Sequence, residues 1–248
     1  MVSTQTLLHA KASKRLKRFV RRMLSATTGY EITRADKILA ADTAKVYTRN
    51  YRRPIKSIFD VGANIGQSVT TYHRLFPDAE IVSFEPVAAN YERLMEVVAK
   101  TPKARAFPYA LGAQAGPATI YVPPVTLSST LLAAGAGHPS QLITVETLDR
   151  MRDQLGIKFI DLIKIDIEGF ELEAIRGAEK TLDTASVGMV FAEAGLRDDN
   201  PLHTHFGRLY GVLQSYGFQS FGLYDIKYWV GSPFGNALFI HESQIKRA

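Results

Sequence analysis

The feature that most constrains the fold is a regular alternation of strand-like and helix-like segments that begins near residue 55. The expected strands are IKSIFDV, AEIVSFE, ARAFPYA, FIDLIKID and VGMVFAEA, and the expected helices are SVTTYHRLF, ANYERLMEVVAK, ELEAIRGAEKTL and LYGVLQSYG. Strands separated by helices are joined by right-handed crossovers, which build a parallel sheet. The alternation therefore predicts an α/β domain.

The end of the chain has a different pattern. Two further expected strands, FQSFGLYD and NALFIH, are separated by IKYWVGSPFG, which we expect to be a loop because it has no helical periodicity. Adjacent strands without a crossover helix run antiparallel. We therefore expect a mostly parallel sheet of about seven strands, with an antiparallel last strand and helices on both faces.

The first 50 residues are expected to form a basic helical extension ahead of a domain over residues 51–248. Seven Lys or Arg and no acid lie in residues 1–25, so the net charge of +6 becomes −1 once they are set aside. The main domain therefore gives no sign of a basic nucleic-acid groove. Within residues 11–24 the apolar side chains share one helical face, which either contacts an anionic membrane surface or packs on protein, the commoner use.

Composition excludes several kinds of site. The 248 residues contain no cysteine, so disulfides and thiolate metal ligands are ruled out. No apolar run approaches the roughly 20 residues of a membrane-spanning helix, and the N-terminus lacks an uninterrupted apolar signal stretch. These features favour a cytoplasmic location, with peripheral contact at the inner membrane surface through residues 11–24 as the alternative.

The strand-to-helix turn FDVGANIGQS is the first candidate binding feature, because parallel sheets bind ligands at the carboxyl ends of their strands. Its two glycines are too close for the phosphate-binding pattern GxxxxGK(S/T), and no Lys follows them. The dinucleotide pattern GxGxxG fails because Asn64 and Gln67 occupy glycine slots. What remains is Asp60 ahead of Gly62 and Gly66, and an acid suits a cationic ligand without phosphate, such as S-adenosylmethionine.

Glu85 ends the next expected strand, in IVSFEP. Its carboxylate can accept both hydroxyls of a ribose, which S-adenosylmethionine and NAD share. The alternative for Asp60 and Glu85 is a structural role, in which each carboxylate caps the helix after its strand.

Over residues 55–241 the chain resembles the FkbM-type family of S-adenosylmethionine-dependent methyltransferases. The segments that carry this resemblance are FDVGANIG, FEP, DLIKIDIEGFELEAIRG, VFAEAG and NALFI. The resemblance implies a Rossmann-like sheet and O-methyl transfer to a sugar, a glycolipid or another small hydroxylated metabolite. The positions that match the family's cofactor site are Asp60, Gly62, Ala63, Asn64, Gly66, Gln67, Glu85, Pro86, Ala110, Leu111 and Asp166, with Ala110 and Leu111 expected beside the adenine. Asp166, Glu168 and Gly169 match its signature after the fourth strand.

The candidate catalytic groups follow the strands FIDLIKID and VGMVFAEA. Asp166 and Glu193 are expected side by side, where one carboxylate becomes a better base for an acceptor hydroxyl or both share a cation; no metal ligand is assigned. Glu168 either joins them or caps the next helix. His203 and His205 are further candidate bases, although either can be an ordinary surface histidine and their spacing also permits a metal.

Other functions fit the sequence less well. A nucleic-acid methyltransferase would use the basic tail as an electrostatic arm, but IDIEGF stands where amino-methylating enzymes place an Asn/Asp-Pro-Pro-aromatic run. An NAD-dependent oxidoreductase is disfavoured by Asn64 and Asp60, and a non-catalytic scaffold is the remaining alternative. We expect a small-molecule or glycan acceptor, bound by the loops 123–141 and 196–208, and the sequence assigns no oligomeric state.

Overall fold

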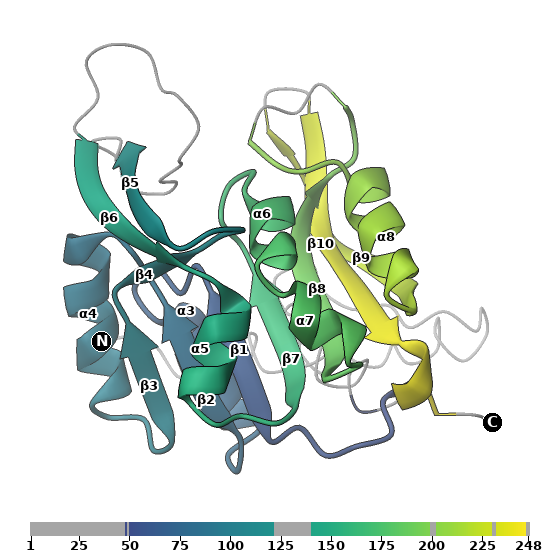
Figure 1. The fold of residues 1–248 in the computed structure, drawn as a ribbon, viewed down its shortest axis with the longest axis horizontal. Helices are drawn as coiled ribbons and strands as arrows, with labels where there is room; N and C mark the ends of the chain where they lie inside the picture. Colours follow the sequence, from purple (N-terminus) through teal and green to yellow (C-terminus); the bar gives the residue numbers. More distant parts are fainter. Residues whose placement is uncertain (1–47, 49, 122–139, 199–201, 230–231, 247–248) are drawn as a thin grey trace, which may run out of the picture.

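The computed structural model describes residues 48, 50–121, 140–198, 202–229 and 232–246. Two predictions lie outside the described residues. One is the helical extension with its membrane-binding or packing face, and the other concerns nearly all of the 123–141 loop. The main sheet has seven strands in the order β3-β2-β1-β7-β8-β10-β9 (Figure 1). Their bounds are β1 Ser57–Val61, β2 Glu80–Phe84, β3 Ala104–Phe107, β7 Ile160–Ile165, β8 Val187–Gly195, β9 Phe218–Trp229 and β10 Ser232–His241.

Strand direction follows the prediction. The pairs β1–β2, β1–β7, β2–β3 and β7–β8 are parallel, whereas β10 runs antiparallel to both β8 and β9. The predicted Rossmann-like sheet with an antiparallel last strand is therefore confirmed. The prediction that IKYWVGSPFG is a loop is wrong, because β9 continues to Trp229 and β10 already begins at Ser232. Cross-strand pairing, for example Lys227 with Phe234, keeps the described parts of this segment, residues 226–229 and 232–235, extended.

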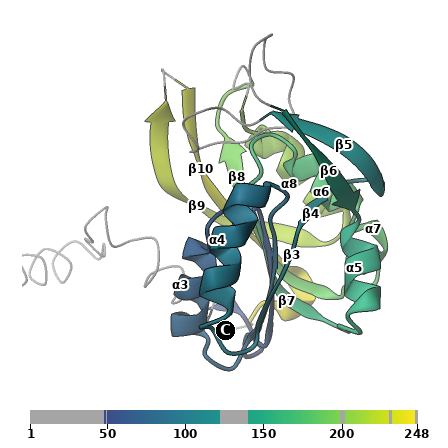
Figure 2. The same cartoon turned by 90° about the vertical axis from the view of Figure 1, so that its left-hand side faces the viewer.

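Helices cover both faces of the sheet, as predicted (Figure 2). One face carries α3 Gln67–Leu75 and α4 Ala88–Val98, and the other carries α5 Leu148–Gln154, α6 Glu171–Arg176, α7 Glu179–Asp183 and α8 Phe206–Ser215, with a short 3-10 helix, η2 Glu242–Gln244, near the end. Each face has its own apolar core cluster. The predicted single helix ELEAIRGAEKTL is two helices that meet at Gly177, where a Cβ would lie 2.1 Å from the Gly112 carbonyl oxygen.

A second, three-stranded sheet was not predicted. Its order is β4-β6-β5, with β4 Tyr109–Leu111, β5 Gly116–Tyr121 and β6 Ser140–Glu146. The expected strand ARAFPYA splits at Pro108, which has no N–H for the ladder, so β3 stays in the main sheet and β4 joins the small one. The small sheet stands over the β1–β3 half of the main sheet (Figure 1), where Ala110 packs against Val87.

Among the described residues, no helix is both long enough and apolar enough to cross a membrane.

Candidate active site

The turn after β1 packs directly against the end of β7. Gly62 has a positive φ of 78°, and a Cβ at this position would lie 2.0 Å from the Asp166 carbonyl oxygen. The Gly62 and Ala63 N–H groups both donate to the Phe84 carbonyl, at 3.0 and 3.1 Å. Gly62 is therefore required because only a glycine lets the ends of β1, β2 and β7 meet this closely.

Asp60 lies below this turn and does not face a ligand. Its side chain is fully buried, accepts a hydrogen bond from the Ser68 hydroxyl, and has an oxygen 3.3 Å from the Lys164 ammonium. The prediction that Asp60 contacts a cationic ligand is corrected by this arrangement, because the cation that it binds belongs to the protein. Asp60 supports the turn from beneath.

Lys164, from β7, contacts both the turn after β1 and the residue that follows β7. Its ammonium donates to the Gly62 carbonyl at 2.7 Å and lies 3.5 Å from an Asp166 oxygen. Burial works to lower the pKa of Lys164, but the Asp60 and Asp166 carboxylates outweigh it and raise that pKa above its usual value. Lys164 is therefore a permanent positive charge between the two acids.

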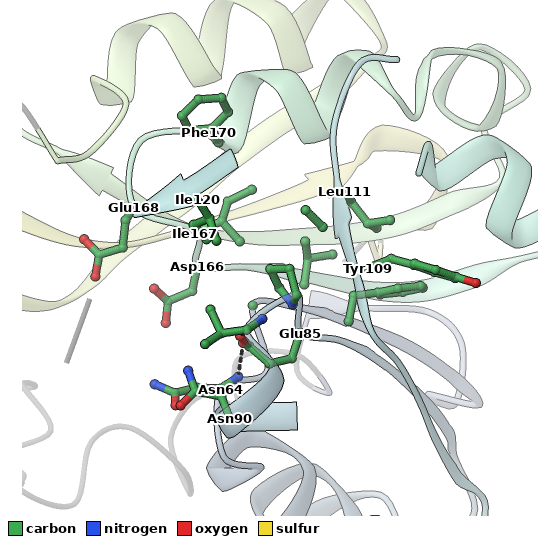
Figure 3. A pocket seen from close by; sticks show the side chains of 16 residues that line it. Asn64, Glu85, Asn90, Tyr109, Leu111, Ile120, Asp166, Ile167, Glu168 and Phe170 are labelled. Carbon is green, nitrogen blue, oxygen red and sulfur yellow. Dashed lines mark hydrogen bonds between the residues drawn. The ribbon is translucent and has the colours of Figure 1, made fainter. Parts of the chain in front are cut away.

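Glu85 projects from the end of β2 into the pocket beside the turn (Figure 3). One carboxylate oxygen accepts the Asn64 N–H at 2.9 Å, and the other accepts the Val87 N–H at 3.0 Å. Burial raises the pKa of Glu85, and these backbone hydrogen bonds oppose the rise. The Asn90 side chain is a third hydrogen-bond donor to Glu85. A carboxylate has about four acceptor positions, so Glu85 keeps acceptor capacity toward the pocket.

The pocket around Glu85 encloses about 830 Å³, including its open mouth. Tyr109 and Leu111 of the small sheet lie across the pocket from the carboxylates of Asp166 and Glu168 (Figure 3), and Ile120 of the same sheet also lines the pocket. The predicted cofactor residues that line this pocket are Gly62, Asn64, Glu85, Pro86, Ala110, Leu111 and Asp166. The predicted residues Asp60, Ala63, Gly66 and Gln67 do not line it; Gly66 instead begins α3 in a left-handed conformation against Val97.

Glu168 belongs to the pocket and is not a helix cap. Its backbone is left-handed, with φ of 52°, and its side chain lines the pocket next to Asp166. Within the described part of the chain, no side-chain hydrogen bond caps α6, and the Glu171 side chain accepts the N–H of Gly169, ahead of the helix, at 3.0 Å. Burial, followed by the Glu193 and Asp166 carboxylates, raises the pKa of Glu168 to about 7. In the sequence, the spacing of Asp166 and Glu168 in the family signature was what pointed to Glu168 as a site residue.

Glu193 and His203 complete an acid–imidazole cluster with Glu168. The His203 Nε2 atom lies 3.0 Å from a Glu193 oxygen and 3.9 Å from a Glu168 oxygen. Burial raises the pKa of Glu193, although the hydrogen bond with His203 opposes that rise. Burial alone would lower the pKa of His203, but the Glu193 carboxylate outweighs burial, so the pKa of His203 is raised. Asp166 and Glu193 follow the paired residues Ile165 and Ala192, as the neighbouring strands predict.

The loop that carries His203 is fixed by a contact that the sequence did not reveal. Glu171 is fully buried and accepts from both the backbone N–H and the hydroxyl of Thr204, at 3.2 and 2.6 Å. The Thr204 carbonyl accepts the Gly195 N–H at 2.9 Å. His203 itself is buried and stacks on Phe234, with ring centroids 4.3 Å apart.

His205 is not part of this cluster. Its Nδ1 atom accepts the Gly207 N–H at the start of α8 and lies 3.3 Å from an Asp198 oxygen. The two histidines of the H-x-H pattern therefore serve different regions, because the chain bends at His203 and starts α8 directly after His205. His203 joins the carboxylates and His205 caps a helix.

Comparison with known proteins agrees with this architecture. Residues 60–220 match the family described as "Methyltransferase FkbM domain". This range spans β1 to the start of β9 and includes Asp60, Glu85, the β7 signature and the His203 loop. The chain belongs to the FkbM methyltransferase-domain family.

Several curated proteins are similar to parts of the chain. "Methyltransferase 1" of Beauveria bassiana is 30% identical over 145 residues, covering 49% of this chain and 58% of that protein. "Hexuronic acid methyltransferase AglP" of Haloferax volcanii is 25% identical over 143 residues, covering 56% of each. This chain therefore matches little more than half the length of these relatives.

The crystal structure of an rRNA methylase from Streptococcus thermophilus has a TM-score of 0.47 and 9% sequence identity, covering 86% of this chain and 99% of that chain.

Proposed function

We propose that this protein is an S-adenosylmethionine-dependent O-methyltransferase that acts on a hydroxyl of a sugar or another small hydroxylated metabolite. The observation that carries the proposal is one pocket with two different ends. Glu85 and an apolar wall lie at one end, and Asp166 and Glu168 lie at the other. Membership of the FkbM family and the hexuronic acid methyltransferase among the relatives support the same reaction.

The donor fits the first end of the pocket by its chemistry. The buried Glu85 carboxylate faces the pocket and would accept the ribose hydroxyls, with the Asn90 side chain as a neighbouring polar group that can turn to the same ribose. Tyr109 and Leu111 offer an apolar face for an adenine ring. From the other end of the same pocket, Asp166 offers negative charge to the cationic portion of the donor. When bound, S-adenosylmethionine supplies a methyl group on a sulfonium, whose sulfur keeps the C–S electron pair as the group leaves.

The acceptor fits the second end of the pocket. A hydroxyl oxygen becomes a good nucleophile only as its proton leaves, so groups that take up that proton or stabilise the negative charge must face it. Glu168 lines the pocket, and Glu193 and His203 stand behind it. This cluster is the part of the chain that would activate the acceptor oxygen.

Calorimetric titration with S-adenosylhomocysteine and, separately, with NAD tests the donor assignment. We expect S-adenosylhomocysteine to bind and NAD not to bind, because no dinucleotide turn is present. Binding of NAD alone would falsify the proposal. A screen of sugars, glycolipids and small alcohols with methyl-labelled donor then tests the acceptor class, and label transfer to nitrogen or carbon in preference to oxygen would contradict it.

A further inference from the structure

We propose that Glu168, Glu193 and His203 bind a divalent metal ion at the acceptor end of the pocket. One oxygen of each carboxylate and the His203 Nε2 atom all lie within 4.8 Å of one another. Both carboxylates face the same ring nitrogen, at 3.0 and 3.9 Å. Ligand atoms bonded to one cation at about 2.1 Å lie roughly 3.0–3.4 Å apart in octahedral or tetrahedral geometry. A small inward movement of Glu168 therefore completes a three-ligand site.

The charges around the cluster favour a cation. Asp166 adds a third carboxylate at this end of the pocket. The Lys164 ammonium lies beside Asp166 but also pairs with the buried Asp60, so one positive charge serves two acids. The buried Glu171 carboxylate also faces this region, held by Gly169 and Thr204. Several acids thus converge on one small volume, where a divalent ion offsets their mutual repulsion.

Each of the three side chains is held by a rigid element. Glu193 lies in β8, which is hydrogen-bonded to β7 on one side and to β10 on the other. His203 stacks on Phe234 with an interplanar angle of 10°, and the next residue, Thr204, is tied to Glu171. Glu168 sits in a left-handed conformation, an uncommon backbone state for a non-glycine residue that is often kept at functional sites. Such support positions ligands before an ion arrives.

The ligand set indicates which ions fit. Two carboxylate oxygens and one imidazole nitrogen, with no thiolate in the whole chain, suit Mn²⁺, Mg²⁺ or Zn²⁺. Three protein ligands leave coordination positions open, and Glu168 borders the pocket, so an acceptor oxygen can approach the ion. The role in activating the acceptor hydroxyl rests on the proposed function; binding of the ion itself does not.

Titration of metal-stripped protein with Mn²⁺ alone, followed by the electron paramagnetic resonance signal of free Mn²⁺, tests the site. We expect one site in the wild type and at least a tenfold weaker affinity in Glu168→Gln, Glu193→Gln and His203→Ala. Glu173→Gln, a partly exposed acid on α6 that pairs with Arg176, is the matched control and should bind like the wild type. Circular dichroism and thermal unfolding show which variants are folded.

Two results would overturn the site: no binding of Mn²⁺ by the wild type, or unchanged binding by the folded Glu168→Gln/Glu193→Gln double variant. Titration of the same metal-stripped samples with S-adenosylhomocysteine separates this inference from the proposed function. Retained S-adenosylhomocysteine binding without Mn²⁺ binding rejects the metal site alone. Mn²⁺ binding without S-adenosylhomocysteine binding rejects the donor assignment and leaves the metal site supported.

Discussion

The two ends of the pocket use the same residue types in opposite ways. At the end formed by β1 and β2, Asp60 and Glu85 are buried, and their oxygens are held by Ser68, Lys164 and backbone N–H groups. At the end formed by β7 and β8, Glu168 and Glu193 face each other and His203. Asp60 is neutralised by contacts within the protein, Glu85 is held by backbone N–H groups at the pocket wall, and Glu168 and Glu193 concentrate negative charge around one imidazole.

This difference explains why an acidic residue in a motif does not by itself identify a ligand contact. Asp60 lies within β1 and Asp166 follows β7, and both contact Lys164, yet Asp60 is fully buried and Asp166 lines the pocket. Their functions differ because Asp60 points beneath the Gly62 turn and Asp166 extends beyond it. The contrast between the two ends leads to four predictions about stability and binding.

The largest expected effect is at Asp60. Asp60→Asn leaves the buried Lys164 ammonium without its nearest carboxylate, so we expect the free energy of unfolding to fall by about 3–5 kcal/mol. Urea unfolding measures the change. Glu80→Gln is the control, because it removes an acid from the exposed Arg105 pair and should cost less than about 1 kcal/mol. Equal effects at the two positions would show that Asp60 is not a structural charge.

At Glu85 we expect a large change in donor binding. Glu85→Gln keeps the size of the side chain but loses the charged acceptor, so affinity for S-adenosylhomocysteine should fall about 10- to 100-fold. Calorimetry measures the affinity. Glu92→Gln is the control, because Glu92 is an exposed acid on α4, the helix that follows Glu85, and this variant should leave the affinity unchanged. Undiminished affinity in Glu85→Gln would mean that the ribose hydroxyls bind elsewhere.

Much of the fold could be predicted from the sequence because its periodicity is local. The nearly all-apolar run before Asp166 and the apolar run before Glu193 are central strands, and both were identified from pattern alone. The hairpin after Tyr224 could not be predicted in the same way, since its extended form comes from pairing with β10. The small sheet was missed for a related reason: β4 is only three residues long and gains its stability from pairing with β6.

The site shows the same limit more sharply. The motif located Gly62, Glu85 and Asp166 at one edge of the sheet because parallel strands end together. It did not reveal that Asp60 binds Lys164, because that pairing depends on the register between β1 and β7. His203 was one of two equivalent histidines in the sequence, and its contacts with Glu193 and Phe234 distinguish it from His205.

At Glu168 we expect a smaller change in the free energy of unfolding, opposite in sign to that of Asp60→Asn. Glu168→Gln removes one of the facing carboxylates, so in the presence of EDTA we expect the free energy of unfolding to rise by about 1–2 kcal/mol. Methyl transfer should fall at least about 100-fold in the same variant. Urea unfolding and label transfer from the methyl donor provide the two readouts. A loss of stability comparable with that of Asp60→Asn would remove the distinction between the two ends.

The smallest predicted effect concerns the contact that holds the His203 loop. Thr204→Val removes the hydroxyl that donates to the buried Glu171 but keeps the backbone N–H, so we expect a loss of about 0.5–1.5 kcal/mol in unfolding free energy. Mn²⁺ affinity should fall along with it, because His203 loses part of its support. Thr184→Val, at an exposed helix end, should change stability by less than about 0.5 kcal/mol and leave Mn²⁺ binding intact. If Thr204→Val lowers stability without weakening Mn²⁺ binding, Glu171 and Thr204 hold the fold together but do not position His203.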